Sequence, residues 1–161
     1  MSAFSPFDMT RGHKPLDPDF ATRIRASFAR QGAMKLIGAR LARIEPGFVE
    51  VELPFRPELT QQHGYFHAGM TSIIADTAAG YAAYSLFPAD STVLTVEFKI
   101  NFVAPALGRK LVATGRVIRR GRTLTPCQME VSAVLGGKAT VCAAGLATMM
   151  CLAGQRDDAN R

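Results

Sequence analysis

One segment in the middle of the chain, residues 67–87, is apolar on nearly every side. The apolar residues in it are Met70, Ile73, Ile74, Ala75, Ala78, Ala79, Tyr81, Ala82, Ala83, Tyr84, Leu86 and Phe87. A helix with this pattern has no face suited to water and must be buried. The remainder of the chain therefore has to surround this helix, and Pro88 marks its end.

Most of the remaining sequence has strand patterns. The turn dipeptide Pro46-Gly47 joins two short runs into a predicted hairpin, at residues 40–45 and 48–53. Four long runs follow the helix, at residues 94–102, 109–119, 123–135 and 138–150. Because these strands follow one another without intervening helices, the sheet should be largely antiparallel. Wrapping it around the apolar helix gives an α+β fold with a single domain.

A second, amphipathic helix is predicted near the N-terminus. Asp17 and Pro18 have the residue types of an N-cap and a first helical position. Three apolar residues then recur every four positions, Phe20, Ile24 and Phe28. Gly32 is the predicted end of this helix.

The length of 161 residues fits one domain. We expect a loose N-terminal arm at residues 1–16, the domain at 17–153 and a C-terminal tail at 154–161. The longest uncharged stretch, residues 139–155, is shorter than the ~20 residues that a membrane-spanning helix needs. Three cysteines without zinc spacing predict buried reduced thiols, and with no secretory signal in the sequence we expect a cytoplasmic protein.

Asp76 is the residue that most suggests a function. It stands in the middle of the apolar helix, too far from its start to be an N-cap. Its helical neighbours Ser72, Ala79 and Gly80 are small, which leaves room for a ligand. A buried carboxylate needs partners or a function, so Asp76 is either a structural hydrogen-bond acceptor or a catalytic carboxylate.

The start of the same helix, His67-Ala68-Gly69, has no Ser, Thr or Asp to cap it. Its first N–H groups either bind water or form a site for a developing oxyanion, and Gly69 would let a ligand approach the backbone. Ala68 and Asp76 lie eight residues apart, which is roughly 12 Å along a helix. If both act on one carbonyl group, they must come from two copies of the chain, which predicts a catalytic dimer.

Other polar residues permit more than one interpretation. His63 and His67 lack a third ligand, so we expect no metal site, and His67 is expected to be a structural donor at the helix entry. Gln61 could bind a carbonyl group or simply be solvated. The turn Arg119-Arg120-Gly121-Arg122 suits phosphate groups, or it is a solvated basic edge. The net charge of +6 favours an anionic partner, but no motif or interleaved aromatic residues indicate nucleic acid.

Residues 61–69, with the sequence QQHGYFHAG, followed by Asp76, resemble the signature of PaaI-type hotdog-fold acyl-CoA thioesterases. Residues 95–105, TVEFKINFVAP, and the turn GRTL at 121–124 resemble the next strand and turn of that family. The resemblance implies a hotdog fold, with a central helix gripped by a curved antiparallel sheet. It also implies dimers, often paired into tetramers, and acyl-coenzyme A substrates.

The resemblance assigns roles to individual residues. Asp76 matches the catalytic carboxylate, as nucleophile or as the base on a water, and Ala68 matches the N–H that polarises the thioester carbonyl from the other subunit. Gln61 matches a carbonyl-binding position often held by Asn, and Thr95 matches a hydroxyl that assists the water. The strand alternation, however, places Thr95 on the polar face of its strand.

The sequence therefore predicts an acyl-CoA thioesterase that acts on medium- or long-chain or aryl-acyl groups. The turn at 119–122 would hold the nucleotide phosphates, and Ala79 and Gly80 would leave room for the acyl group. We expect a homodimer or homotetramer that uses neither a metal nor a redox cofactor and contacts no membrane. The alternatives are a non-catalytic acyl-CoA-binding module, which would not need Asp76, and a hotdog dehydratase, which would want a histidine beside the acid.

Overall fold

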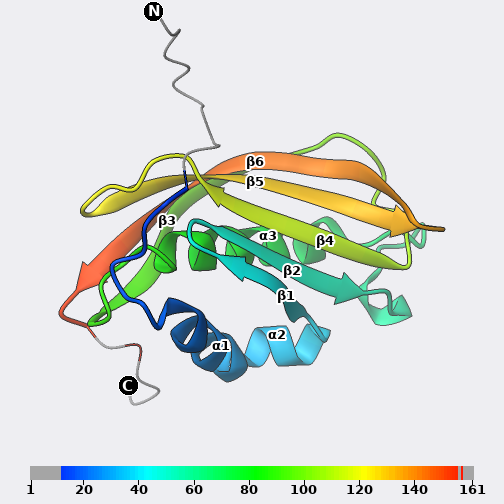
Figure 1. The fold of residues 1–161 in the computed structure, drawn as a ribbon. Helices are drawn as coiled ribbons and strands as arrows, with labels where there is room; N and C mark the ends of the chain where they lie inside the picture. The colour runs from blue at the N-terminus through cyan, green and yellow to red at the C-terminus, as the bar shows by residue number, and fades with distance from the viewer. Residues whose placement is uncertain (1–11, 156, 158–161) are drawn as a thin grey trace, which may run out of the picture.

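The computed structural model describes residues 12–155 and 157. One long helix, α3 (Ala68–Tyr84), lies inside a curved six-stranded sheet. In Figure 1 the strands β4, β5 and β6 arch over α3, and two short N-terminal helices lie below it. This is the hotdog fold, an α+β architecture, so the expected apolar helix inside a sheet is confirmed. Its burial holds for most of residues 71–87, whereas His67, Ala68 and Gly69 at its start are exposed.

All neighbouring strands are antiparallel, in the order β1-β2-β4-β5-β6-β3. Their bounds are β1 (Arg40–Glu45), β2 (Phe48–Pro54), β3 (Ser91–Phe102), β4 (Lys110–Val117), β5 (Leu124–Leu135) and β6 (Lys138–Ala153). The strand that follows α3 in the sequence, β3, lies at the sheet edge opposite β1. It pairs only with β6, which leaves its other edge without a partner among the described residues.

The N-terminal helix differs from the prediction at both ends. Helix α1 (Phe20–Arg30) has Asp19 as its N-cap, so Asp17 and Pro18 are not the cap and the first helical residue. The carboxylate of Asp17, two residues before this N-cap, accepts the backbone N–H of Asp19 over 2.9 Å. Gly32 does not end a helix but begins a second one, α2 (Gly32–Ile37). The chain is extended at Gln31, between the two helices, and α2 ends at Gly38, which has a φ of 77°. A short 3-10 helix, η1 (Pro57–Leu59), precedes α3.

Part of the predicted loose arm lies on the domain. The ring nitrogen Nε2 of His13 is 3.2 Å from the carbonyl oxygen of Val117, at the end of β4. The imidazole also lies against Gly47, where a side chain would collide with it. Residues 1–11 of that arm, and residues 156 and 158–161 of the predicted tail, lie outside the described residues.

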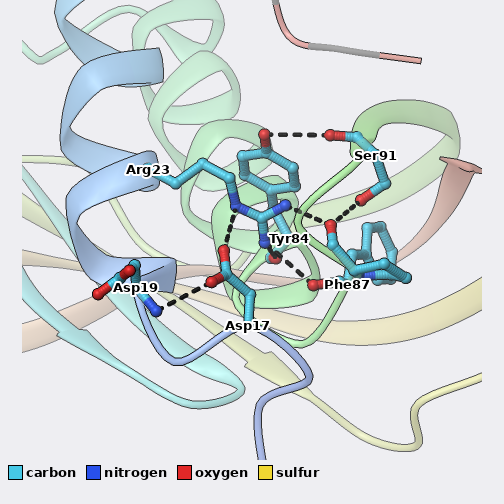
Figure 2. Close-up of polar contacts among 7 residues, drawn as sticks. Asp17, Asp19, Arg23, Tyr84, Phe87 and Ser91 are labelled. Carbon is cyan, nitrogen blue, oxygen red and sulfur yellow. Dashed lines mark hydrogen bonds and ion pairs between the residues drawn. The ribbon is translucent and has the colours of Figure 1, made fainter. Parts of the chain in front are cut away.

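Arg23 connects α1 to the C-terminal end of α3 (Figure 2). Its guanidinium donates to the carbonyl oxygens of Tyr84 and Phe87 over 3.1 and 3.0 Å, and to that of Pro88. Its Nε lies 3.1 Å from Asp17 Oδ2, and the group stacks 4.1 Å from the Tyr84 ring centroid. Helix α3 ends at Tyr84, three residues before the expected end, and Arg23 binds carbonyl groups that the ended helix leaves available.

Helix α3 packs very closely against β4. A side chain at Gly115 would collide with the backbone of Ala78 and Ala79, both of which are completely buried. Only glycine on the strand and alanine on the helix allow this approach.

The three cysteines also lie in the buried part of the molecule as free thiols, and burial raises the pKa of Cys127 to about 12. No helix in the described part of the chain has the length and apolarity that spanning a bilayer requires.

Candidate active site

The carboxylate of Asp76 points from the middle of α3 toward β3. The Thr95 hydroxyl donates a hydrogen bond to Asp76 Oδ1 over 2.8 Å. Burial raises the pKa of Asp76 above its usual value, and the hydrogen bond from Thr95 opposes part of that rise. Asp76 is therefore a partly desolvated carboxylate held by a hydroxyl group, which is the environment of a reactive acid or base.

The position of Thr95 corrects the strand alternation expected from the sequence. Thr95 pairs with Met149 whereas Glu97 pairs with Thr148, so Val96 is an extra residue in a β-bulge. Before the bulge Thr95 lies on the face of Met149, and after it Phe98 lies on the face of Ala147. Since Met149 and Ala147 are both buried, Thr95 and Phe98 share the face toward α3. Strict alternation put them on opposite faces, and that prediction was wrong.

A pocket of about 610 Å³ opens beside Asp76, between α3, β3 and the α1–α2 region. Besides Asp76 and Thr95 it is lined by Ser27, Arg30, Gln31, Ala33, Met34, Ile73, Thr77, Gly80, Tyr81, Thr92, Val93 and Asp157. Gly80 faces open space, as expected of a residue that leaves room for a ligand. The structure places Ala79 elsewhere, in the core against Gly115, so it does not line this pocket.

The start of α3 is capped, contrary to the expectation from its residue types. His67 is the N-cap, and its Nδ1 accepts the backbone N–H of Gly69 over 2.8 Å. His67 is therefore an acceptor here rather than the expected donor, and the N–H of Gly69 is already bonded. A Cβ at position 69 would lie 3.0 Å from that nitrogen, so this cap favours glycine two residues after His67. The spacing His67-x-Gly69 is therefore the feature of the sequence that could have predicted the cap. The N–H of Ala68 makes no hydrogen bond to any described residue and stays available to a ligand.

Gln61 faces its own loop in this chain. Its backbone N–H donates to Tyr65 O over 2.9 Å, and its side-chain Oε1 accepts the N–H of His63. Its side chain does not line the pocket beside Asp76. Within the described residues no group of three or more His, Cys, Asp or Glu side chains could hold a metal ion.

The basic turn lies at the other end of α3. Arg119, Arg120 and Arg122 are exposed. Between them lies Gly121, where any side chain would collide with the carbonyl oxygen of Leu124. The turn lines a smaller pocket of about 220 Å³ with Leu16, Leu86, Phe87, Pro88 and Cys151. One chain thus joins Asp76 and Thr95 in a pocket, but keeps Ala68 and the arginine turn apart from it.

Comparisons with known proteins agree with this arrangement. The family model of the thioesterase superfamily matches residues 63–139. A solved structure of a thioesterase family protein from Silicibacter pomeroyi is 44% identical, with a TM-score of 0.82 over 84% of this chain and 99% of that one. The PaaI protein of E. coli, from the phenylacetic acid degradation operon, is 20% identical with a TM-score of 0.77 over 87% and 98% of the two chains. A 1,4-dihydroxy-2-naphthoyl-CoA hydrolase of Listeria monocytogenes is 25% identical over 101 residues, which are 63% of this chain and 82% of that protein.

A curved sheet around a central helix, with a carboxylate on that helix facing a pocket, is a hotdog fold with a candidate active site. With 44% identity over nearly the whole length of a thioesterase family structure, the chain belongs to the thioesterase superfamily and is a thioester hydrolase.

Proposed function

We propose that the protein hydrolyses acyl-coenzyme A thioesters to the free acid and coenzyme A, with Asp76 as the catalytic carboxylate. The observation that carries this proposal is the hydrogen-bonded pair of Asp76 and Thr95 at the wall of a pocket large enough for an acyl group. The Listeria relative, which is named as a hydrolase of an aryl-CoA, supports the choice of coenzyme A thioesters.

The reaction needs only water and groups of the protein. Acting as a base, Asp76 takes a proton from water while the water oxygen bonds to the thioester carbon. The carbonyl oxygen becomes an oxyanion, and when the C–S bond breaks the sulfur leaves with the proton. If Asp76 acts instead as a nucleophile, its carboxylate oxygen bonds to the thioester carbon, the C–S bond breaks and coenzyme A leaves as the thiolate, and water then hydrolyses the resulting anhydride to the acid and free Asp76. In both routes Thr95 orients the carboxylate, and no metal or redox cofactor takes part.

The oxyanion donor comes from a second copy of the chain in this proposal. Ala68 N–H and the Asp76 carboxylate lie at two places on α3 that are roughly 12 Å apart along its axis, so one carbonyl group cannot meet both. Strand β3 offers the surface for pairing: it is an edge strand with exposed apolar residues that include Leu94, Val96 and Phe98. Two-fold pairing along β3 would form a homodimer with two equivalent sites, and these dimers would pair into a homotetramer.

The acyl group would be of medium or long chain or aromatic, and it would lie in the pocket beside Gly80.

The nucleotide phosphates would bind Arg119, Arg120 and Arg122. The turn that carries these arginines lies beside β6, because Cys151 N donates a hydrogen bond to Thr123 O. Cys151 in turn pairs with Val93 of β3, so two strand spacings, roughly 10 Å, separate the turn from the start of β3. The flexible pantetheine arm of coenzyme A can cover such a distance. Gln61 and His67 of the second copy, which precede its Ala68, would contact the carbonyl end.

A thioesterase is favoured over a binding module because a binding module has no need of a desolvated carboxylate held by a hydroxyl. It is favoured over a dehydratase because the described residues that line the pocket include no histidine.

The test is release of free thiol from acyl-CoAs ranging from acetyl through palmitoyl and phenylacetyl. Asp76→Asn should lower turnover on the order of a thousandfold or more, because the amide can neither take a proton nor attack. Asp90→Asn, which alters an exposed carboxylate outside the pocket, is the matched control and should keep full turnover. Full turnover by Asp76→Asn would refute the role of Asp76. Binding without turnover by the unaltered protein would support the binding module.

The shared site has its own test in Ala68→Pro. Ala68 is the first residue of α3, where proline fits the helix and removes only the N–H, and His67 already has the extended backbone that precedes proline. Ala68→Pro and Asp76→Asn should each be inactive alone. Mixed and allowed to exchange subunits, they should regain about a quarter of the activity, because half of the dimers are mixed and each contains one intact site. No recovery despite exchange would place both groups in the same chain.

A further inference from the structure

The space between α1 and α3 continues beyond the pocket beside Asp76. On α3, Asp76 and Tyr81 line that pocket, and Tyr84 lines a second pocket of about 420 Å³. On α1, Ser27 lines the first of these pockets and Ala26 lines the second. The pocket beside Asp76 and the pocket beside Tyr84 therefore follow one another along the same two helices, toward the C-terminal end of α3.

Two residues line both pockets: Arg30 of α1, and Asp157, which follows β6. Arg30 Nη2 lies 2.8 Å from Asp157 Oδ2 and also donates to the carbonyl oxygen of Asp157. The other terminal nitrogen, Nη1, donates to the carbonyl oxygen of Ala26 over 3.1 Å. Because the pair is common to both walls, it lies at the boundary between the two pockets and separates them.

The charges of this ion pair act on the tyrosines on both sides of the boundary. The ring centroids of Tyr81 and Tyr84 are 6.3 Å apart. Burial raises the pKa of both hydroxyls, Asp157 raises both further, and Arg30 opposes the rise at both. One ion pair close to two successive tyrosines of α3 agrees with its place at the boundary.

The pocket beside Asp76 has a polar end near the ion pair. Gln31 Nε2 donates to Tyr81 Oη over 2.9 Å, and Tyr81 Oη donates to Ser27 Oγ over 3.0 Å. These hydrogen bonds, together with the ring of Phe28 at 6.0 Å, hold Tyr81 in place. The way from one pocket to the other is therefore opened by movement of Arg30 and not of the tyrosine.

The ion pair between Arg30 and Asp157 is weak enough to be displaced. Their side chains are 40% and 33% exposed, so water reaches both charges. An exposed pair of this kind favours its bonded state by about fivefold or less, and dissolved salt weakens it further. A ligand that gains apolar contacts on the other side can therefore separate the two side chains.

The pocket beside Tyr84 can take the far end of a long acyl chain. Tyr84 follows Asp76 by eight residues, roughly 12 Å along the helix axis. Ala26, Ala89 and the Tyr84 ring contribute apolar surface. Arg23 also lines this pocket, but its guanidinium is already bound to carbonyl oxygens at the end of α3. A short acyl group stays beside Asp76, whereas a long one has to pass the ion pair.

We propose that the ion pair of Arg30 and Asp157 divides the acyl-binding groove and so sets the length of acyl chain that the protein accepts. With the pair formed, chains that end before Tyr84 are accommodated. With the pair separated, the two pockets join and longer chains extend between α1 and α3. This inference rests on the function proposed above, because it assumes that the thioester carbonyl lies beside Asp76.

The test is the ratio of kcat/KM for palmitoyl-CoA to kcat/KM for octanoyl-CoA, both below the concentrations at which micelles form. Arg30→Ala removes the pair and should raise this ratio about fivefold, by improving palmitoyl-CoA alone. Arg25→Ala removes the same charge from an exposed position of α1 that lines neither pocket, and this matched control should leave the ratio unchanged. Added salt should raise the ratio in the unaltered protein but not in Arg30→Ala.

An exchange of the two charges separates the effect of the ion pair from the effect of side-chain size. Asp157→Arg places two cations together and should raise the ratio as Arg30→Ala does. Arg30→Asp combined with Asp157→Arg restores an ion pair and should return the ratio to that of the unaltered protein. A ratio that stays high in the double variant, or that none of these variants changes, would overturn the division of the groove.

Calorimetric binding of the same two thioesters to Asp76→Asn, with and without Arg30→Ala, gives the ratio without turnover. We expect Arg30→Ala to strengthen the binding of palmitoyl-CoA about fivefold and to leave that of octanoyl-CoA unchanged. Absence of turnover with every thioester, together with this change in affinity, would overturn the proposed hydrolysis and keep the division of the groove. Turnover with an affinity ratio that Arg30→Ala leaves unchanged would overturn the division alone.

Discussion

The two sides of α3 use small residues for opposite purposes. Toward β4, Ala78 and Ala79 meet Gly115 so closely that no further atom fits between helix and strand. Toward β3 and α1, Gly80 faces open space, and the pocket beside Asp76 lies there. Small side chains allow close packing on one side of α3 and leave a cavity on the other. The neighbouring element therefore decides which of the two effects a small residue has.

The largest effect is expected on the packed side. Gly115→Ala should destabilise the protein by about 2–3 kcal/mol, because the new methyl group would collide with backbone atoms of α3, which cannot move aside as a flexible side chain can. The measurement is the free energy of unfolding from denaturant titration. Gly32→Ala, where a side chain meets no atom, is the control. Equal stability of the two variants would mean that α3 and β4 are less closely packed than the structure has them.

The same substitution on the open side should have the opposite sign. Gly80→Ala should stabilise the protein by about 0.5–1 kcal/mol, because alanine favours a helix interior and its methyl group meets nothing. Gly80→Leu should keep the fold but fill the pocket, lowering kcat/KM for an aromatic acyl-CoA by about tenfold or more. Thermal unfolding and turnover of both variants check this. Full activity of a folded Gly80→Leu would place the acyl group elsewhere.

A smaller effect concerns the protonation of Asp76. Because burial raises its pKa, activity should fall on the acid side at a higher pH than for an exposed aspartate. Thr95→Val removes the hydrogen bond that favours the carboxylate, so the pKa should rise further and this acid limb should move to higher pH. The pH profile of kcat/KM measures the shift. An unmoved limb in Thr95→Val would assign it to another group.

The raised pKa also has a consequence for stability with a definite sign. The folded protein holds the Asp76 proton more tightly than the unfolded chain, so stability falls as the pH rises from the unfolded pKa through the folded one. Above that range the ionised Asp76 lowers the free energy of unfolding. Asp76→Asn should therefore have a higher Tm than the unaltered protein near neutral pH, and this advantage should disappear in acid.

The sequence predicted the elements that repeat a simple pattern. An apolar helix and alternating strands define the core, because burial imposes those periods. Asp76 could be recognised because a carboxylate inside such a helix is costly. The placement of Thr95 could not be predicted, because the extra residue Val96 reverses the two faces of β3 and the local sequence does not indicate such a bulge.

Other features depend on contacts between distant segments. The cap by His67 needs a ring nitrogen rather than the usual short oxygen side chain. The polar end of the pocket combines Ser27 and Gln31 with Tyr81, some fifty residues later in the chain. Neither Ser27 nor Gln31 belongs to a motif, so only the folded arrangement gives them a common surface.

Arg23 has a consequence for how this protein could change its substrate. It attaches α1 to the end of α3 on the side away from the pocket, while Ser27 and Gln31 reach the pocket from the next turns of the same region. The α1 region is thus attached to α3 by one residue and lines the pocket with others. Substitutions at positions 27 and 31 would remove hydrogen bonds to Tyr81 and change the pocket wall, while the Arg23 contacts would still attach α1 to the end of α3. The pocket wall can therefore vary while the attachment of α1 stays the same.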